Sequence, residues 1–327
     1  MRCVLMNRVM IFMLSLLSLG YSVALLDLSQ AAEYPQKPIT VVVPHPPGGG
    51  TDMVARVLSE KMRAHLGQPV VVVNKSSTPV GISEVVLARP DGYTLGYVHS
   101  NYLTLAPLLS ELPFKGPLDM SIIATAHTTG VVLAVGAGSP WKTSRDLLEA
   151  SKAAPGKIRV SGSNLGSINH INILELNELG KGQLVYVPFV VGPQALAAFL
   201  GGHAEAFTNT AIEAKPHIDA GKARILGIFT QKRNGMIPDV PTMKEQGFDV
   251  SYAFMGVLFG PKRLPDEVMA MLQEVAKKAV QDSSYIASNR KMGFETFFVR
   301  SDDLTKQLAA EQDKMKVLVE RFNLKEK

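Results

Sequence analysis

The chain has 327 residues, of which 46% are apolar and 19% charged, and its formal net charge is +5. This composition supports one large or two medium folded domains and excludes extensive disorder. Because the basic residues are spread out, with no Lys/Arg-rich run and no basic–aromatic alternation, nucleic-acid binding is not expected.

The first element in chain order is a predicted export signal over residues 1–31. Arg2 and Arg8 give a positively charged segment before an apolar run over Val9–Leu26, and small residues allow cleavage near Ala31/Ala32. We therefore expect a periplasmic protein. An uncleaved membrane anchor is the alternative, since the apolar run is near spanning length.

Metal, cofactor and disulfide chemistry are not expected. Cys3 is the only cysteine and would leave with the signal. The seven histidines show no HxH, HxxxH or HExxH spacing.

Short apolar runs alternate with helical patterns along the rest of the chain, which predicts an α/β fold with parallel-rich sheets flanked by helices. Other local signals are capping boxes at Thr143–Asp146 and Thr242–Glu245, a turn at Arg89–Tyr93 and a final amphipathic helix over Leu304–Phe322. The expected strands are Ile39–Val43, Val70–Val73, Tyr93–Val98, Val131–Val135, Ile158–Val160, Leu184–Val187, Ile225–Phe229 and Val257–Phe259.

A glycine-rich loop follows the first expected strand and opens a helix. Its residues Gly48, Gly49, Gly50 and Thr51 offer backbone N–H groups to a small anion. The pattern is neither a dinucleotide fingerprint nor a Walker loop, and a plain glycine turn is the alternative. Asp52 either caps the helix or holds a hydrogen-bond donor of the ligand.

A second loop, rich in hydroxyl and amide groups, follows the strand at Ile158–Val160. A nucleophile elbow is not present, because Asn164 stands at the centre of Gly162–Gly166. We expect Ser167 to cap the next helix, and His170 is either a core residue or a ligand contact. The candidate ligand-binding residues here are Ser161, Ser163, Asn164, Ser167, Asn169 and His170.

A third candidate loop, Val187–Gly192, also lies at a junction between a strand and a helix, and Phe189 is its candidate ligand-binding residue. Ligands bind at the carboxyl ends of parallel strands, so the three loops are expected to converge on one site. Asn209 completes the predicted set of ligand-binding residues.

These residues resemble the tripartite tricarboxylate transporter substrate-binding proteins, also called the Bug family, over nearly all of the mature chain. The resemblance includes Tyr34–Ile39, Pro47–Asp52, Ala88–Leu95, the loop at Ser161–His170, Val187–Phe189, Ala220–Arg224, Pro238–Thr242 and Gly256–Pro261. It implies a two-lobed type II periplasmic binding protein, the Venus-flytrap fold, with lobe 1 from 32–130 and 251–327 and lobe 2 from 131–250.

The resemblance also implies a function without catalysis. The protein would capture a small carboxylate between its lobes and deliver it to the membrane subunits of a tripartite transporter, acting as a monomer. An exported serine hydrolase using Ser163 or Ser167 is one alternative, and a ligand-sensing subunit for a signalling partner is another.

The sequence departs from the family pattern at three places. Hydroxyl residues and a proline replace a glycine-rich run in Asn74–Gly81, Phe189–Gly192 replaces a Tyr-Lys-Gly run, and Phe254 stands where the family has tryptophan. The replacement at Phe189–Gly192 removes a hydroxyl and a cation. Together the changes make this wall more apolar, which favours a ligand with an apolar or aromatic body over a compact tricarboxylate.

Overall fold

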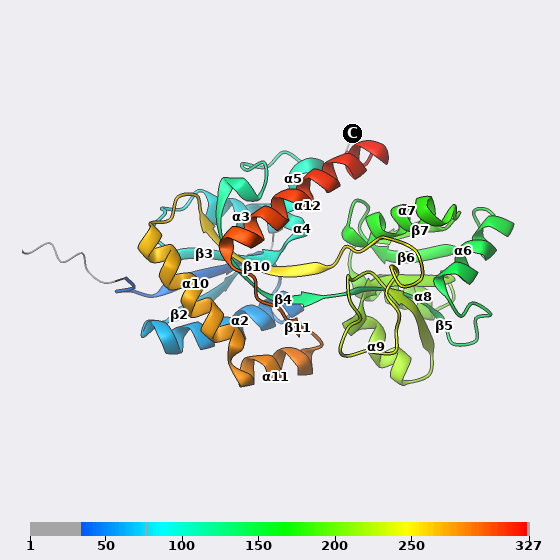
Figure 1. Cartoon of the computed structure of the whole chain (residues 1–327), viewed down its shortest axis with the longest axis horizontal. Coiled ribbons are helices and arrows are strands. Elements are labelled where there is room, and N and C mark those ends of the chain that lie inside the picture. The colour runs from blue at the N-terminus through cyan, green and yellow to red at the C-terminus, as the bar shows by residue number, and fades with distance from the viewer. Residues whose placement is uncertain (1–33, 76, 326–327) are drawn as a thin grey trace, which may run out of the picture. The chain divides into compact units, whose positions relative to one another are not determined.

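The computed structural model describes residues 34–75 and 77–325. The predicted signal over 1–31 lies outside the described residues. The chain divides into an N-terminal unit, Met1–Lys37, whose described residues form no helix or strand, and a second unit, Pro38–Lys327. The second unit contains two mixed β-sheets flanked by helices (Figure 1), so the predicted α/β class is confirmed.

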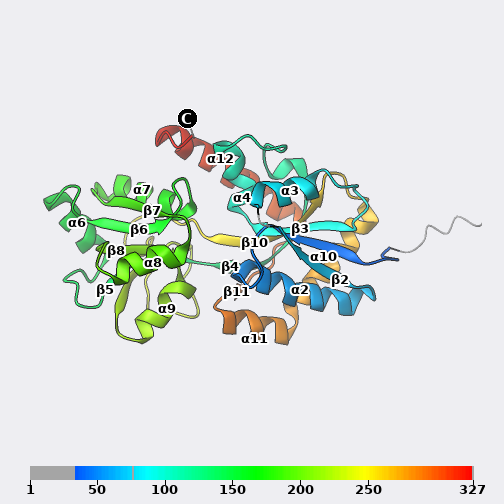
Figure 2. The same ribbon diagram turned by 180° about the vertical axis from the view of Figure 1, so that it is seen from behind.

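The first sheet has the strand order β11-β4-β10-β3-β1-β2. Helices α2, α10 and α11 pack together, while α3, α4 and α12 share a core with β1 and β10 (Figures 1 and 2). The elements in this part are β1 (Ile39–Val43), α2 (Gly50–Leu66), β2 (Val70–Asn74), α3 (Thr78–Val86), β3 (Thr94–His99), α4 (Asn101–Thr104), α5 (Ala106–Leu109), η1 (Pro117–Asp119), β4 (Met120–Thr129), β10 (Phe254–Pro261), α10 (Asp266–Gln281), α11 (Ser283–Met292), β11 (Glu295–Thr296) and α12 (Ser301–Arg321).

The second sheet has the order β7-β6-β8-β5-β9. Helices α8 and α9 contribute to one hydrophobic core with β5, β8 and β9, and helices α6 and α7 contribute to another. The elements are β5 (Val131–Gly136), α6 (Ser144–Ala153), β6 (Arg159–Ser163), α7 (Ile168–Gly180), β7 (Val185–Phe189), α8 (Gly192–Leu200), β8 (Ala206–Thr210), α9 (Ala211–Asp219) and β9 (Ala223–Ile228).

The eight expected strands are present with shifts of a few residues at some ends, but both sheets are mixed rather than parallel throughout. In the first sheet β10 runs antiparallel to β3 and β4, and in the second β5 runs antiparallel to β8 and β9. Strands β4, β8 and β11 were not predicted. Polar and small residues interrupt the apolar pattern of β4 and β8, and β11 has only two residues.

The carboxyl ends of strands from both sheets lie where the chain crosses between the sheets. Strand β4 runs parallel to β3 and passes through the single residue Gly130 into β5. The amino end of β5 pairs with the carboxyl end of β8, which is parallel to β6, and β6 is parallel to β7. The carboxyl ends of β1 and β3 in one sheet, and of β6, β7 and β8 in the other, therefore border the same crossover.

Sheet membership changes at Gly130 and again between β9 and β10. The last helix links the two parts. Leu304 and Leu308 pack in the first-sheet core, whereas Met315 and Leu318 pack in a core with residues of the second sheet. The end of α12 also carries Arg321, which pairs with Glu178 of α7 at 3.0 Å.

The local capping signals are confirmed. Thr143 and Asp146 exchange hydrogen bonds at the start of α6. Thr242 and Glu245 also exchange theirs, but the residues after them form turns instead of a helix. At the turn before β3, Asp91 accepts a hydrogen bond from the backbone N–H of Tyr93.

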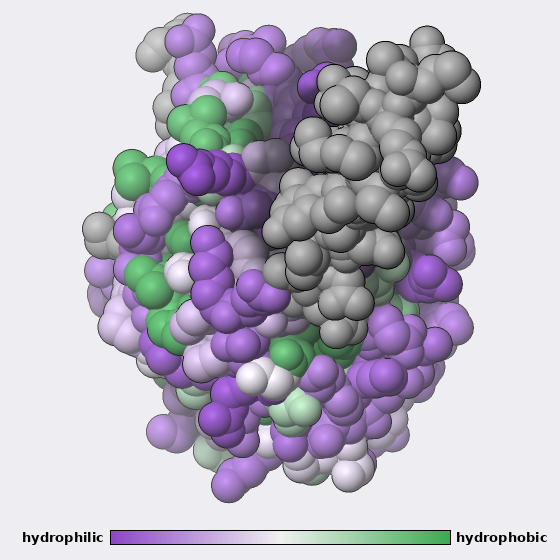
Figure 3. Space-filling model, turned by 90° about the vertical axis from the view of Figure 1, so that its left-hand side faces the viewer, coloured by the Kyte–Doolittle hydropathy of each residue, from purple (hydrophilic) through white to green (hydrophobic). Residues whose placement is uncertain are grey.

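Figure 3 looks onto the side that lies at the left of Figure 1. Hydrophilic residues predominate on the visible surface, and apolar residues are scattered over it. Edge strand β2 contributes two exposed apolar side chains, Val71 and Val73. Across 34–75 and 77–325, none of the helices combines the length and hydropathy that crossing a membrane requires.

Candidate functional site

The glycine loop joins β1 to the N-terminus of α2. Gly48 has a φ of 82°, a left-handed conformation that favours glycine. Gly49 occupies the N-cap position and has no side chain to satisfy the first-turn N–H groups. The helix N-terminus therefore presents backbone donors and a positive partial charge, as an anion site requires.

Asp52 is buried and holds this loop together. Its Oδ2 accepts from the backbone N–H of Gly48 at 2.8 Å and from Arg56 Nε at 3.0 Å, and its Oδ1 accepts from Asn74 Nδ2 at 2.8 Å. Burial acts to raise the pKa of Asp52, but the bonds from Arg56, Gly48 and Asn74 outweigh it and lower the pKa below its usual value. The carboxylate is thus ionised and already has charged and neutral partners.

The β6–α7 loop is built from local hydrogen bonds. Ser167 is the N-cap of α7: its Oγ accepts from the backbone N–H of His170 at 3.3 Å and donates to the carbonyl of Ser163 at 3.1 Å. Nδ1 of His170 accepts from the backbone N–H of Gly166 at 3.0 Å, and burial lowers the pKa of this imidazole to about 4. His170 therefore shapes the loop as a neutral side chain.

Three of the predicted residues form one polar network at the carboxyl edge of the second sheet. Nδ2 of the fully buried Asn169 donates to Ser163 Oγ at 2.7 Å and to Asn209 Oδ1 at 3.3 Å. Asn209 Oδ1 also accepts from the backbone N–H of Thr210, so it must be an oxygen. This fixes the Asn169 amide, whose own Oδ1 is buried without a partner.

Ser161 lies outside this network, which corrects the expectation that its side chain contacts a ligand. Its hydroxyl is fully buried within the second lobe and donates to the carbonyl of Ala195 in α8 at 2.9 Å. The side chain points to α8 because it alternates with Val160 across the sheet.

The second and third loops touch each other. With its amide nitrogen facing the third loop, Asn164 donates to the carbonyls of Phe189 and Val190, each at 3.2 Å. Phe189 is partly buried against the α8–α9 core, while Val190 and Val191 are exposed.

Glu213 was not among the predicted site residues, although it lies in the first turn of α9 beside this network. A side chain at Gly192 would collide with Asn209 Nδ2 and with both carboxylate oxygens of Glu213, which places the two groups together against the N-terminus of α8. Glu213 Oε2 is shielded from solvent and has no hydrogen-bond partner, and burial raises the pKa of the carboxyl to about 7. The only sequence signal for Glu213 is an acidic residue in the first turn of a helix that follows a strand. The sequence analysis missed this signal because it predicted neither β8 nor α9.

Three histidines, which the sequence reading left unassigned, lie near one another at the first-sheet edge. The His99 ring lies 5.5 Å from that of His127 and 6.4 Å from that of His45, and the Nε2 atom of each is buried without a partner. His127 Nδ1 is 2.5 Å from the hydroxyl of Tyr97. Burial lowers the pKa of all three, that of His127 to about 3, so they are neutral at pH 7.

Contacts across the crossover bring these groups near one another. The ring of Phe294 lies against Gly50, where a Cβ would come within 2.8 Å, and 4.6 Å from the ring of His127. Ile212, the residue before Glu213, packs on Gly293 in the same way. The start of α9 in the second lobe therefore meets the segment that supports the start of α2 in the first.

Within the described chain, neither Ser163 nor Ser167 bonds a histidine side chain, and no group of three or more His, Cys, Asp or Glu side chains is suited to hold a metal ion.

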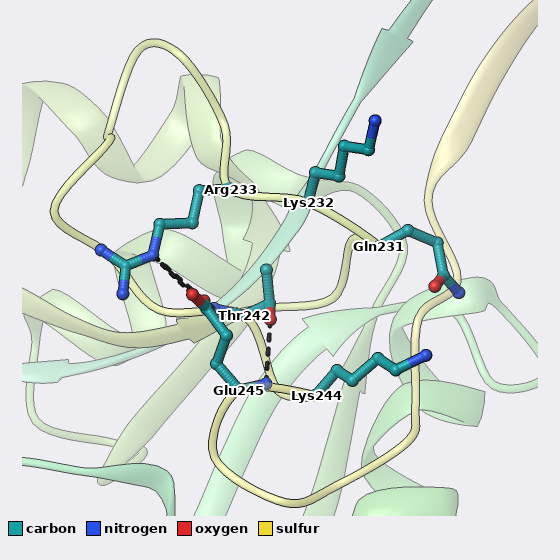
Figure 4. A pocket seen from close by; sticks show the side chains of 6 residues that line it. All are labelled: Gln231, Lys232, Arg233, Thr242, Lys244 and Glu245. Atoms are coloured by element: carbon teal, nitrogen blue, oxygen red, sulfur yellow. Dashed lines mark hydrogen bonds and ion pairs between the residues drawn. The ribbon is translucent and has the colours of Figure 1, made fainter.

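Two open cavities lie elsewhere in the second lobe. One, of about 380 Å³, is lined by residues of the 231–245 segment; Figure 4 shows its Arg233 and Glu245 paired, with Lys232 and Lys244 directed away from that pair. The Arg233–Glu245 pair is roughly half exposed, so it contributes little to stability. The other cavity, of about 500 Å³, lies beside the amino end of β9, away from the loops described above.

Comparison with known proteins gives a family match over most of the chain. The model of the tripartite tricarboxylate transporter family receptor matches residues 54–324. A UPF0065 protein encoded in the gbd 5′ region of Cupriavidus necator is 30% identical over 298 residues, which cover 90% of each protein.

Two solved structures are similar throughout. A TctC solute-binding protein from Polaromonas, without ligand, has a TM-score of 0.78 and 27% identity, covering 88% of this chain and 99% of the other. MatC from Rhodopseudomonas palustris, with bound malate, has a TM-score of 0.72 and 26% identity, covering 88% and 100%.

Proposed function

The chain belongs to the tripartite tricarboxylate transporter receptor family, and on that premise we propose that it is a periplasmic solute-binding protein for a small carboxylate. The ligand binds at the crossover between the two sheets and is passed to the membrane subunits of a tripartite transporter. The protein acts as a monomer and without catalysis.

One observation carries the proposal: the carboxyl ends of strands from both sheets border one crossover, and the uncapped N-terminus of α2 lies there. The N-cap of α2 is Gly49, which provides no side-chain oxygen. Ligands of α/β proteins bind at such strand ends. MatC, which is similar over its whole length, holds malate, a small dicarboxylate.

The residues divide into those that would touch the ligand and those that hold the loops. In the proposal, the backbone of Gly48, Gly49, Gly50 and Thr51 and the side chains of Ser163, Asn164, Asn169 and Asn209 bind polar groups. Asp52, Ser167 and His170 position the loops, because their polar atoms are engaged in local bonds.

An apolar or aromatic ligand body remains part of the proposal. It is supported by Val190 and Val191, which are 73% and 48% exposed beside the partly buried Phe189. Apolar side chains at a binding site give favourable burial to an apolar ligand body.

The direct test is native mass spectrometry of the protein purified from the periplasm of its host. We expect a co-purified small acid, a mass for the mature chain that fits cleavage near Ala31/Ala32, and a monomer. A thermal-shift screen should then give larger shifts with aromatic or aliphatic monocarboxylates than with citrate. A screen in which no carboxylate raises the melting temperature would refute the function, and a larger shift with citrate would refute the apolar body.

A further inference from the structure

The second-lobe edge contains two buried acceptors without donors, one in the Asn169–Asn209 network and one beside it. Asn169 Oδ1 is fully buried and unpartnered, and its identity as an oxygen follows from the bonds of Asn209. Glu213 Oε2 is also shielded and unpartnered, on the far side of Asn209. A buried acceptor that lacks a donor destabilises the fold, so a ligand donor that bonded either atom would be stabilised there.

The two buried acids near the crossover differ in their counter-ions. Asp52 is 3.0 Å from Arg56 and is neutralised by it. Glu213 forms no ion pair with any described residue, and it lies beside the amide of Asn209 at the start of α8. Its carboxylate occupies the positive end of α8, so this helix start is unfavourable for a second carboxylate from the ligand.

We propose that Glu213 binds an ammonium group of the ligand, so that the protein selects carboxylates that also carry an amine. The inference rests on the proposed function, because it assigns the ligand's carboxylate to the glycine loop of the first lobe. The ammonium donates to the unpartnered Oε2 of Glu213 and is the counter-ion that this carboxylate lacks.

The test compares acids that differ only in the amine. Calorimetry of the full mature chain would measure L-phenylalanine against 3-phenylpropanoate and L-aspartate against succinate. We expect the amino acid to bind at least about tenfold more tightly in one pair or both, as a charge-assisted hydrogen bond implies. Equal or weaker binding of the amino acid in both pairs would overturn the inference.

Two variants locate the effect. Glu213→Gln keeps the size of the side chain but removes its charge, and should abolish the preference while the acid without an amine keeps its affinity within about threefold. Glu213→Asp retains the charge and should retain part of the preference, which also guards against a glutamine variant that folds poorly.

Glu311→Gln is the matched control. Burial also raises the pKa of Glu311 to about 7, but this carboxyl accepts a hydrogen bond from Thr104 at 2.8 Å and lies in the first lobe. Glu311→Gln should leave the preference for the amino acid over the acid without an amine unchanged. A preference that survives in Glu213→Gln would overturn the inference. If the wild-type protein binds neither member of either pair, the inference is also overturned. The proposed carboxylate-binding function is decided separately, by the thermal-shift screen of carboxylates.

Discussion

At the scale of single residues, position in the network decides what each polar side chain can do. Ser163 and Asn209 lie in one network at a sheet edge, whereas Ser161, two residues from Ser163, donates into the interior of its own lobe. These serines are alike in sequence. The direction of each side chain and the nearest unpaired group separate a candidate ligand contact from a structural one.

Substitutions at the two loops test the ligand contacts. Gly49 has ordinary backbone angles, and the nearest atom to an added Cβ would be 3.5 Å away, so Gly49→Val should fold normally and cover the helix N-terminus. We expect about tenfold or greater loss of ligand affinity for Gly49→Val, and about two- to tenfold for Ser163→Ala. Calorimetry with the ligand found by the carboxylate screen gives the affinities, and unchanged values in both variants would place the site elsewhere.

His127 predicts a pH dependence of stability. Its pKa falls from 6.5 unfolded to about 3 folded, so the unfolded state binds the proton first and stability is lost as the pH falls below 6.5. This residue should account for a loss of about 2 kcal/mol between about pH 7.5 and 5. Urea denaturation at both pH values should show a loss smaller by that amount in His127→Phe.

Wild type must be compared with His127→Phe because two buried acids change the stability with pH in the direction opposite to His127. The pKa values of Glu213 and Glu311 are raised to about 7, so these groups add stability as the pH falls from 7 toward 4.5. They are present in both proteins and cancel in the difference. An identical pH dependence in wild type and His127→Phe would contradict the assignment.

At the scale of elements, β10 shows how one strand determines the position of a polar cluster. It lies between β3 and β4, and Gly256 is in register with His99 on one side and His127 on the other. A Cβ there would collide with the Tyr97 hydroxyl and the His127 ring. The close approach of Tyr97 to His127 therefore requires a glycine on the strand between them.

Gly256→Ala should destabilise the protein by about 1–3 kcal/mol, because the added methyl group overpacks a buried site. Gly136→Ala is the control at the end of another strand, where nothing lies within 4 Å of an added Cβ, and should change stability by less than about 0.5 kcal/mol. Denaturant titrations measure the free energy of unfolding of both variants. Equal changes in the two would show that the neighbouring strands and side chains make room for the methyl group at Gly256.

At the scale of the whole molecule, the C-terminal helix connects the two sheets energetically. Met315 and Leu318 are buried in the core that includes Leu133 of β5 and Leu148 of α6, while the first turns of the same helix pack under β10. Unfolding of either sheet with its helices would expose buried side chains of α12 and so weaken the packing of the other sheet. We therefore expect the mature protein to unfold in one cooperative transition.

Met315→Ala should cost about 2–5 kcal/mol and weaken this connection, so that calorimetry shows a broadened or divided transition. Val317 on the same turn is 52% exposed, and Val317→Ala should behave as wild type. Two separate transitions in the wild-type protein would contradict the coupling.

The sequence by itself determined the local units of this protein. Alternating apolar runs, glycines and capping residues predicted the β1–α2, β6–α7 and β7–α8 junctions, because strand, turn and helix starts depend on neighbouring residues. The chain-wide motifs predicted the family, and the fold and the family match agree with them.

Only the tertiary structure decided which distant groups meet. The pairing of Asp52 with Asn74, the cluster of three histidines and the place of Glu213 beside Asn209 depend on strand order and on contacts between sheets. These contacts join residues far apart in the chain, and no local pattern encodes them. The sequence left open whether Asp52 caps its helix or holds a donor of the ligand. Its ion pair with Arg56 is local, four residues along the same helix, whereas its bond with Asn74 and the position of Glu213, which has no counter-ion among the described residues, depend on the tertiary structure.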